Sequence, residues 1–212
     1  VNNADFISCS LDSFLVRYDM IKNLKKGGTF LLNTGFKKED IEAQLPNRVK
    51  KQLAQKKAKF FIIDATKIAE EIGMGRRTNT ILQSSFFALN ETILPYANAL
   101  DYMKEMAKKS YQKKGDEVVE LNWKAIDEGK NGLVQIEVKP EWADLTVART
   151  RRTTGDEYFD THVVVINALD GYDMPVSAFT KHGLLDGSFR NNVAFSEHRA
   201  IATQVPQWHE EN

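Results

Sequence analysis

Cysteine is nearly absent from this chain, in which Cys9 is the single one among 212 residues. One thiol excludes an internal disulfide, and it excludes a metal site built on several cysteines of this chain. Cys9 ends an apolar segment, where a cysteine is more often a small buried hydrophobic side chain than a reactive thiol. We therefore expect a structural role for Cys9, with reactivity as the alternative.

Long hydrophobic runs and targeting signals are also missing. No segment approaches the roughly 18 apolar residues of a membrane span, and Val1 to Asp5 include neither a basic nor an apolar signal region. The content of 42% hydrophobic and 27% charged residues is that of an ordinary soluble globular protein. We expect a cytoplasmic protein with a sizeable core and no membrane contact.

Motifs for nucleophilic or nucleotide chemistry are lacking. The chain has no Ser/His/Asp order, no Gly-x-Ser-x-Gly and no Walker loop. Gly73-Met74-Gly75 lacks the third glycine of a dinucleotide fingerprint and follows a predicted helix, not a strand. The histidines match no compact metal motif, so we expect exposed loop positions for all of them: His162, His182, His198 and His209.

Charge is balanced overall but unevenly distributed. Residues 1–115 carry 20 Lys/Arg against 12 Asp/Glu, a balance of +8, and residues 116–212 carry 9 against 17, a balance of −8. A positive first half suits an anionic ligand or an acidic partner, although solvated helices can give the same distribution. A dense basic patch without interleaved aromatics is more typical of a solvated helix face than of nucleic-acid binding, which we do not expect: Lys50, Lys51, Lys56, Lys57 and Lys59.

The first part of the chain alternates between strand and helix patterns. Apolar segments predict strands over 4–9, 29–33 and 60–63. Apolar residues at spacings of three and four predict helices over 11–26, ended by Gly27-Gly28, over 38–57, interrupted at Pro46, and over 65–71. This alternation is typical of an α/β fold, and we expect a three-layer α/β/α sandwich with a mostly parallel sheet.

From residue 79 onward the pattern is helical and then irregular. Helices are predicted over 81–90, 96–111 and 117–129, the first two meeting at Pro95. Residues 140–212 read as an irregular, extended tail that contains one strand over 161–167. We thus predict an α/β domain over 1–139 followed by a linker over 140–212. Because a first strand begins at residue 4, we expect earlier strands outside this chain, as in an N-terminally truncated piece.

Two polar residues stand where such a sheet places ligands. Asn33 closes a buried strand at its carboxyl end, and Arg77 follows the helix after the next strand. If these strands are adjacent, both side chains can face one crevice, where Asn offers a donor and an acceptor and Arg a planar fork for phosphate. In the alternative interpretation Gly73 only ends a helix and the arginines are solvated.

Several segments in order resemble the third, gamma-type domain of pyruvate:ferredoxin (flavodoxin) oxidoreductase and the linker before its ferredoxin-like domain. The resemblance spans nearly the whole chain. It is carried by Ala4-Asp5-Phe6-Ile7-Ser8-Cys9, Gly27-Gly28-Thr29-Phe30-Leu31-Leu32-Asn33, Phe61-Ile62-Ile63-Asp64-Ala65, Gly73-Met74-Gly75-Arg76-Arg77-Thr78-Asn79, Met174-Pro175-Val176-Ser177-Ala178-Phe179, Asp186-Gly187-Ser188-Phe189 and Val205-Pro206-Gln207-Trp208. Arg76 stands where relatives can have glycine and makes the turn more basic.

The resemblance implies an enzyme that converts pyruvate and coenzyme A to acetyl-coenzyme A and CO2 while reducing ferredoxin or flavodoxin. It implies that Asn33 and Arg77 help to bind coenzyme A and that no catalytic residue lies in this chain. Thiamine diphosphate, Mg²⁺ and 4Fe-4S clusters would belong to other domains of a homodimeric enzyme. The coenzyme A site would be shared with a segment that precedes Val1, and this piece alone would be inactive and bind no cofactor. A non-catalytic docking module of a larger assembly is the alternative.

Overall fold

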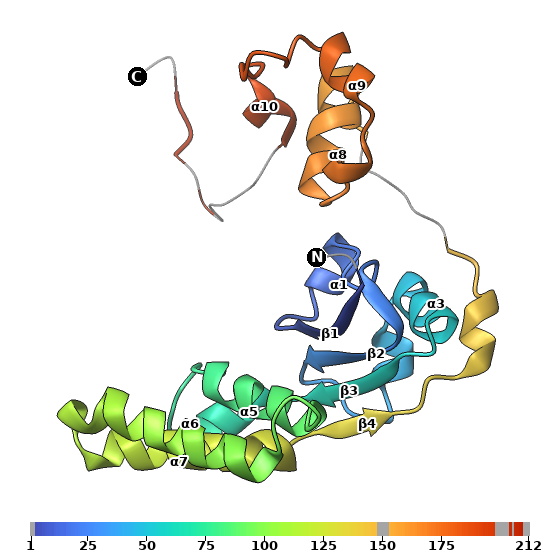
Figure 1. Ribbon diagram of the computed structural model, residues 1–212. Coiled ribbons are helices and arrows are strands. Elements are labelled where there is room, and N and C mark those ends of the chain that lie inside the picture. Colours follow the sequence, from blue (N-terminus) through green and yellow to red (C-terminus); the bar gives the residue numbers. More distant parts are fainter. Residues whose placement is uncertain (1–2, 148–152, 198–203, 205, 210–212) are drawn as a thin grey trace. The chain divides into compact units, whose positions relative to one another are not determined.

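The computed structural model describes residues 3–147, 153–197, 204 and 206–209 (Figure 1). The chain forms two compact units, Val1–Val147 and Ala148–Asn212. The first unit is built on a sheet, and the second consists of short helices joined by loops. None of the helices in the described residues is long and apolar enough to cross a membrane.

Strands and helices of the first unit follow one another largely in the order that the sequence pattern predicts, with a few short elements added. In chain order they are β1 (Ala4–Cys9), α1 (Phe14–Arg17), β2 (Leu24–Asn33), α2 (Ile41–Gln44), α3 (Asn47–Gln55), β3 (Lys59–Ile63), α4 (Ala65–Glu71), α5 (Asn79–Leu89), α6 (Tyr96–Tyr111), the 3-10 turn η1 (Gln112–Lys114), α7 (Asp116–Asn131), β4 (Val134–Ile136) and the 3-10 turn η2 (Pro140–Asp144).

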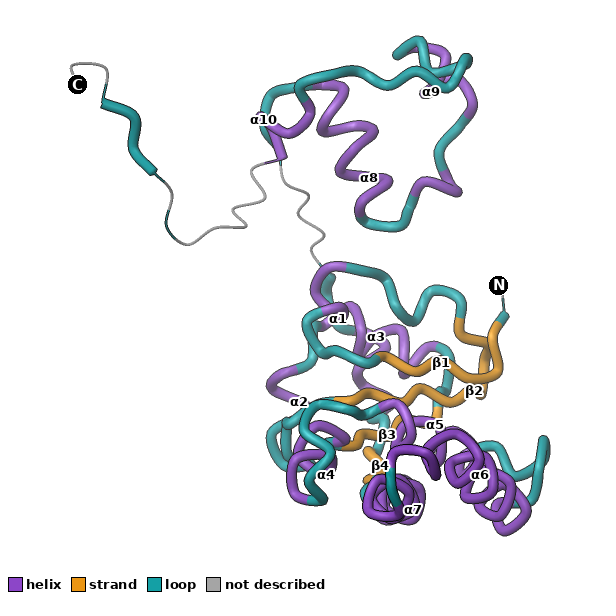
Figure 2. The backbone as a smooth tube through the Cα atoms, turned by 90° about the vertical axis from the view of Figure 1, so that its left-hand side faces the viewer, coloured by secondary structure: helices purple, strands orange, loops and turns teal. Residues whose placement is uncertain are grey.

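The sheet has the strand order β1-β2-β3-β4, visible as adjacent orange segments in Figure 2. The first three strands pair in parallel, with Phe30 opposite Phe60 and Asn33 opposite Ile63. The short strand β4, which the sequence pattern does not predict, pairs antiparallel with β3. The expectation of a mostly parallel sheet is confirmed, and the strands that end at Asn33 and Ile63 are neighbours.

Alternate residues of the central strands enter two separate cores. Phe30 and Leu32 pack with α2 and α3 on one face, and Leu31 and Ile63 pack with α4, α5 and α7 on the other. Both faces are therefore covered, which explains why β2 is almost entirely apolar over its last residues. The predicted three-layer α/β/α arrangement is confirmed.

The helix predicted over 11–26 is wrong in most of its length. Only Phe14–Arg17 is helical, and Gly27 and Gly28 lie within β2 instead of ending a helix. Carbonyl oxygens that would accept helical hydrogen bonds accept from a side chain of α3 instead. Arg48 Nη2 donates to the carbonyl oxygens of Leu15 (3.0 Å) and Tyr18 (2.7 Å). A segment whose carbonyls are satisfied from another element does not need its own helical ladder.

The other predicted helices of this unit agree with the structure. Residues 38–57 form α2 and α3 on either side of Pro46, and Pro95 directly precedes α6. The helix α7 packs against α4, α5 and α6. Met103, Ala107 and Ile126 form a small core between α6 and α7. In Figure 1 the long helices α5, α6 and α7, drawn in green, lie together beside β3 and β4.

The segment after β4 continues to pack on the first unit. The turn η2 contacts α3, and the Trp142 ring is 3% exposed. Glu42 on α2 accepts hydrogen bonds from Trp142 Nε1 (3.0 Å) and Lys139 Nζ (2.6 Å). These bonds fasten the chain beyond the sheet to its α2 and α3 face.

The second unit contains short helices only, over the residues that the structure describes. They are the π-helical turn η3 (Phe159–Val163), α8 (Val164–Asn167), the 3-10 turn η4 (Gly171–Asp173), α9 (Val176–Lys181) and α10 (Val193–Glu197). The predicted strand over 161–167 is therefore wrong. Its β-branched residues lie in a helix, which places His162 and Val165, three residues apart, on the same side, and both are buried.

Candidate functional site

Asn33 lies at the carboxyl end of β2, as predicted, and is 7% exposed. Its Nδ2 donates to the Ser10 carbonyl oxygen (3.1 Å), and its Oδ1 accepts from the Ala65 backbone N–H (2.9 Å). The amide thus ties the loop after β1 to the first turn of α4. One N–H and one acceptor lone pair of the amide are left for another partner.

The turn from Gly73 to Arg77 connects α4 to α5. Gly73 has φ +86° and follows the C-cap residue of α4, while the Met74 N–H donates back to the Ala69 carbonyl (2.8 Å). Gly75 has φ +60°, which only glycine adopts at little cost. The Arg77 N–H closes this turn on the Met74 carbonyl (3.4 Å). Both glycines therefore have the backbone role expected of them, and together they place two arginines immediately before α5.

Arg76 and Arg77 line a hollow of about 300 Å³, which we call the arginine hollow. Its lining residues are Met74, Arg76, Arg77, Thr78, Asn79, Thr80, Tyr111 and Asn122. No carboxylate is among them. Neither guanidinium forms an ion pair with any residue of the described ranges. Asn33 does not line this hollow, so the two predicted residues do not meet in it.

The N-terminus of α5 opens onto the arginine hollow. Thr78 precedes the helix without a side-chain cap hydrogen bond, and the first turn has no acidic residue. The partial positive charge of a helix start thus adds to the two guanidinium charges. Such an environment favours an anionic group, and phosphate matches the planar fork of arginine.

Four lining residues carry polar groups that the sequence did not assign to the site: Thr78, Thr80, Tyr111 and Asn122. Asn122 is 3% exposed, its Nδ2 donates to the Val118 carbonyl (2.8 Å), and its Oδ1 accepts from Thr80 Oγ1 (3.4 Å). A sequence signal for Asn122 exists, because it interrupts the buried, otherwise apolar face of α7 between Val119 and Ala125.

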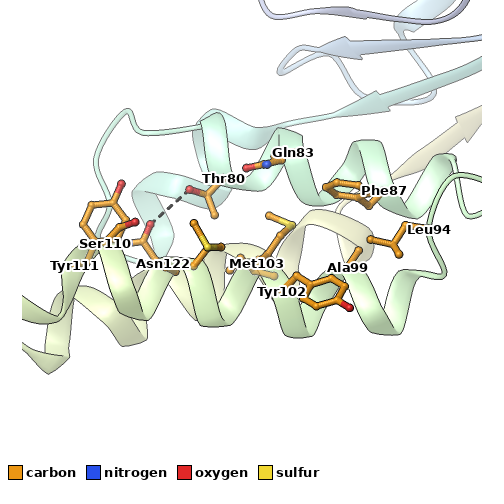
Figure 3. A pocket seen from close by; sticks show the side chains of 13 residues that line it. Thr80, Gln83, Phe87, Leu94, Ala99, Tyr102, Met103, Ser110, Tyr111 and Asn122 are labelled. Atoms are coloured by element: carbon orange, nitrogen blue, oxygen red, sulfur yellow. Dashed lines mark hydrogen bonds between the residues drawn. The ribbon is translucent and has the colours of Figure 1, made fainter.

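A second hollow of about 320 Å³, the α5–α6 groove, continues from the arginine hollow (Figure 3). The two share Thr80, Tyr111 and Asn122. Beyond these the groove is lined by Gln83, Phe87, Leu94, Ala99, Tyr102, Met103, Met106, Ala107, Ser110 and Ile126. Figure 3 shows Tyr111 and Asn122 at one end and Phe87 and Leu94 at the other. A basic, polar hollow thus adjoins a groove that is lined by both polar and apolar side chains.

Comparison with known proteins decides the family. A family model described as pyruvate ferredoxin/flavodoxin oxidoreductase matches residues 1–132. The chain belongs to this family. Pyruvate:ferredoxin oxidoreductase from Moorella thermoacetica is 38% identical over 213 residues, which cover 100% of this chain and 18% of the relative. Pyruvate-flavodoxin oxidoreductase from Klebsiella pneumoniae is 39% identical over 212 residues, with the same two coverages of 100% and 18%. The chain therefore spans less than a fifth of the length of these relatives.

A solved structure has a related fold. Subunit PORC of pyruvate oxidoreductase from Thermotoga maritima superposes with a TM-score of 0.51 and 20% sequence identity, covering 65% of this chain and 67% of that chain. At this identity the likeness concerns the fold alone. It agrees with the α/β architecture and the mostly parallel sheet described above.

Cys9 and the basic patch, two other features of the sequence, both have structural roles in the first unit. Cys9 is fully buried, its Sγ donates to the Leu11 carbonyl (3.1 Å), and burial raises the pKa of the thiol, which disfavours the reactive thiolate. In the basic patch, Lys50, Lys51 and Lys56 donate to backbone carbonyls of Glu42, Leu145 and Leu24. These lysines help to fasten neighbouring segments, which is a structural use of the patch.

The prediction that all four histidines are exposed is wrong for His162. This residue is 1% exposed, and neither ring nitrogen has a hydrogen-bond partner among the residues that the structure describes. It packs against Tyr158 and Phe179, and against His182 with ring centroids 4.7 Å apart. Burial, and secondarily the nearby His182, lower the pKa of His162. His198 lies outside the described residues. Across those residues no three His, Cys, Asp or Glu side chains are grouped to hold a metal.

Proposed function

We propose that this chain contributes to the coenzyme A site of a pyruvate:ferredoxin (flavodoxin) oxidoreductase. The observation that carries the proposal is the arginine hollow in a chain of this family. The hollow offers two guanidinium groups that have no acidic partner among the described residues, an uncapped helix start and the amides of Asn79 and Asn122. Coenzyme A has three phosphate groups that need such donors.

In this proposal the chain supplies position. Coenzyme A brings the thiol that accepts the acetyl group, and Arg77 holds a phosphate at the end of the molecule remote from that thiol. Asn33 acts at the neighbouring strand end, where it fixes the loop at Ser10 and keeps one N–H for the ligand. Holding the ligand in one orientation, and closing over the thiamine site, converts a bimolecular encounter into an intramolecular one.

We assign the other cofactors to parts of the longer enzyme. A 4Fe-4S cluster requires a set of cysteine ligands, and this chain has Cys9 alone. Thiamine diphosphate with its Mg²⁺ would likewise bind elsewhere in a cytoplasmic, homodimeric enzyme that reduces ferredoxin or flavodoxin. The chain by itself should therefore not turn over pyruvate, and turnover with added thiamine diphosphate and an electron acceptor would contradict this assignment.

The direct test is calorimetric titration of coenzyme A into the full enzyme that contains this chain, at low ionic strength. Arg77→Gln should weaken binding roughly tenfold, since one charge-assisted hydrogen bond contributes about 1.5 kcal/mol. Arg17→Gln, which removes an exposed arginine from α1, is the matched control and should bind like the unmodified chain. In the full enzyme Arg77→Ala should raise the KM for coenzyme A and leave decarboxylation without coenzyme A intact. Equal affinities of Arg77→Gln and the unmodified chain would refute the assignment.

The second unit supports a docking role as a second function. Large apolar side chains are more than two-thirds exposed at Tyr172, Val176, Leu185, Phe189, Phe195 and Trp208. Exposed apolar side chains in such number mark contact surfaces. We infer that residues 153–197 and 206–209 dock on other domains of the longer enzyme. Hydrogen exchange in 153–197 should be slower in the full enzyme than in this chain, and equal exchange would exclude the docking.

A further inference from the structure

The arginine hollow is lined by two guanidinium groups, each of which can bind a phosphate group on its own. Arg76 and Arg77 are consecutive, so their Cα atoms are about 3.8 Å apart, and both side chains are exposed and line the same hollow. The turn with Gly75 at φ +60° fixes this pair before α5. Lys114 adds a third cation nearby, with its Nζ 5.6 Å from the centroid of the Tyr111 ring.

These charges are not neutralised within the hollow. The remaining lining groups, on Thr78, Asn79, Thr80, Tyr111 and Asn122, are uncharged, and Met74 is apolar. Like charges so close together repel each other, and this repulsion is relieved when an anion binds between or beside them. Each guanidinium offers five N–H donors, and one phosphate uses two of them from a single arginine in the bidentate arrangement.

We propose that Arg76 is a specificity-determining residue that selects ligands with a phosphate monoester in addition to the group held by Arg77. The inference rests on the proposed coenzyme A site. Coenzyme A carries a diphosphate and a separate 3′-phosphate monoester, and the monoester has the higher charge at a single phosphorus. Dephospho-coenzyme A lacks only the monoester. The preferred ligand class is therefore the 3′-phosphorylated nucleotide derivatives, and Arg76 discriminates them from those without the monoester.

The alternative role for Arg76 is that its charge raises the positive potential of the whole hollow without contacting the monoester. A general positive potential acts on every phosphate of the ligand. Salt screens it with a Debye length of about 8 Å at physiological ionic strength. Because coenzyme A carries the additional monoester charge, a general potential also favours it over dephospho-coenzyme A. Every nearby cation contributes to a general potential, whereas a specific contact is lost only when Arg76 is replaced. The comparison of Arg76→Gln with Lys114→Gln therefore separates the two roles.

The experiment titrates coenzyme A and dephospho-coenzyme A into the full enzyme, with the unmodified chain or one of its variants, at one salt concentration. The unmodified chain should bind coenzyme A roughly tenfold more tightly than dephospho-coenzyme A. Arg76→Gln should remove this preference by weakening coenzyme A roughly tenfold and dephospho-coenzyme A less than about twofold. Arg77→Gln should weaken both ligands alike. Lys114→Gln, which removes a nearby cation outside the lining of the hollow, should keep the preference. Far-UV circular dichroism verifies that each variant is folded.

The outcomes separate the two proposals. If both ligands bind and Arg77→Gln weakens them, but Arg76→Gln leaves the ratio of affinities unchanged, the role of Arg76 is refuted and the coenzyme A site stands. The role of Arg76 is refuted equally if Lys114→Gln lowers the preference as much as Arg76→Gln does, since the charge then acts generally. If neither ligand binds saturably, the coenzyme A site itself is refuted, and the role of Arg76 with it.

Discussion

The contact between α5 and α7 is so close that one added methyl group should destabilise the first unit. Gly129 on α7 faces Ser84 on α5, where a Cβ atom at position 129 would lie 2.4 Å from Ser84 Cβ, 2.6 Å from the Ile81 carbonyl oxygen and 2.7 Å from Ser84 Oγ. None of these atoms is the end of a long, flexible side chain. Gly129→Ala therefore forces the helices apart.

The size of the effect follows from these distances. Carbon atoms pack at about 3.5 to 4.0 Å, so the helices must separate by roughly 1 Å, and overpacking of this kind costs about 1 to 3 kcal/mol. The separation also lengthens the hydrogen bonds from Ser84 Oγ to the Ile126 carbonyl and from Ser85 Oγ to the Gly129 carbonyl, both 2.6 Å, each worth about 1 kcal/mol. Alanine returns about 1 kcal/mol of helix propensity. The free energy of unfolding should fall by about 2 to 4 kcal/mol.

Urea unfolding followed by far-UV circular dichroism measures this loss. Lys124→Ala on the exposed side of α7 is the control, and it should change the free energy of unfolding by less than about 0.5 kcal/mol. Ser84→Gly in the Gly129→Ala background removes the closest contact and should restore part of the loss. If Gly129→Ala is as stable as the unmodified chain, the close approach of α5 and α7 is refuted.

Two further predictions concern buried polar side chains. The pKa of His162 is lowered in the folded protein, so the unfolded state binds more protons as the pH falls. The stability of the second unit should therefore be complete above about pH 6.5. It should decline as the pH falls through the lower pKa of the folded state. Hydrogen exchange over 153–197, corrected for the intrinsic pH dependence of exchange, measures this decline. His162→Phe should abolish it. If the variant shows the same pH dependence as the unmodified chain, His162 is not the cause of the decline. Asn33→Ala should lower the free energy of unfolding by about 2 kcal/mol, since two hydrogen bonds of a buried amide are lost. Urea unfolding measures this change. A free energy of unfolding equal to that of the unmodified chain would contradict the bridging role of the amide.

Much of the first unit could be predicted because local patterns and tertiary packing agree there. The apolar strands β2 and β3 are covered on both faces, and the helices α5, α6 and α7 have apolar residues at helical spacing. The segment 11–26 has the same spacing but a different structure: Arg48 from α3 binds the carbonyl oxygens of Leu15 and Tyr18, and residues 24–26 already belong to β2. The strand β4 is too short to give a pattern, and it exists because β3 offers a free edge for antiparallel pairing.

The second unit shows the opposite relation between pattern and structure. Four consecutive β-branched residues from Val163 to Ile166 favour a strand by propensity, but a helix places His162 and Val165 on one buried side. The exposed position predicted for His162 failed for the same reason, because packing against Tyr158, Phe179 and His182 depends on how the chain folds back on itself.

For the candidate site, the sequence alone determined the glycine turn, the end of a buried strand at Asn33 and the two arginines before a helix, because glycine, strand and helix signals are local. Only the tertiary structure decided which side chains share a hollow. The approach of α6 and α7 to the start of α5 brings Tyr111 and Asn122 to Arg77, while the amide of Asn33 is turned toward Ser10 and Ala65. Neighbours of this kind arise from helix packing between segments distant in the sequence, and no local pattern encodes them.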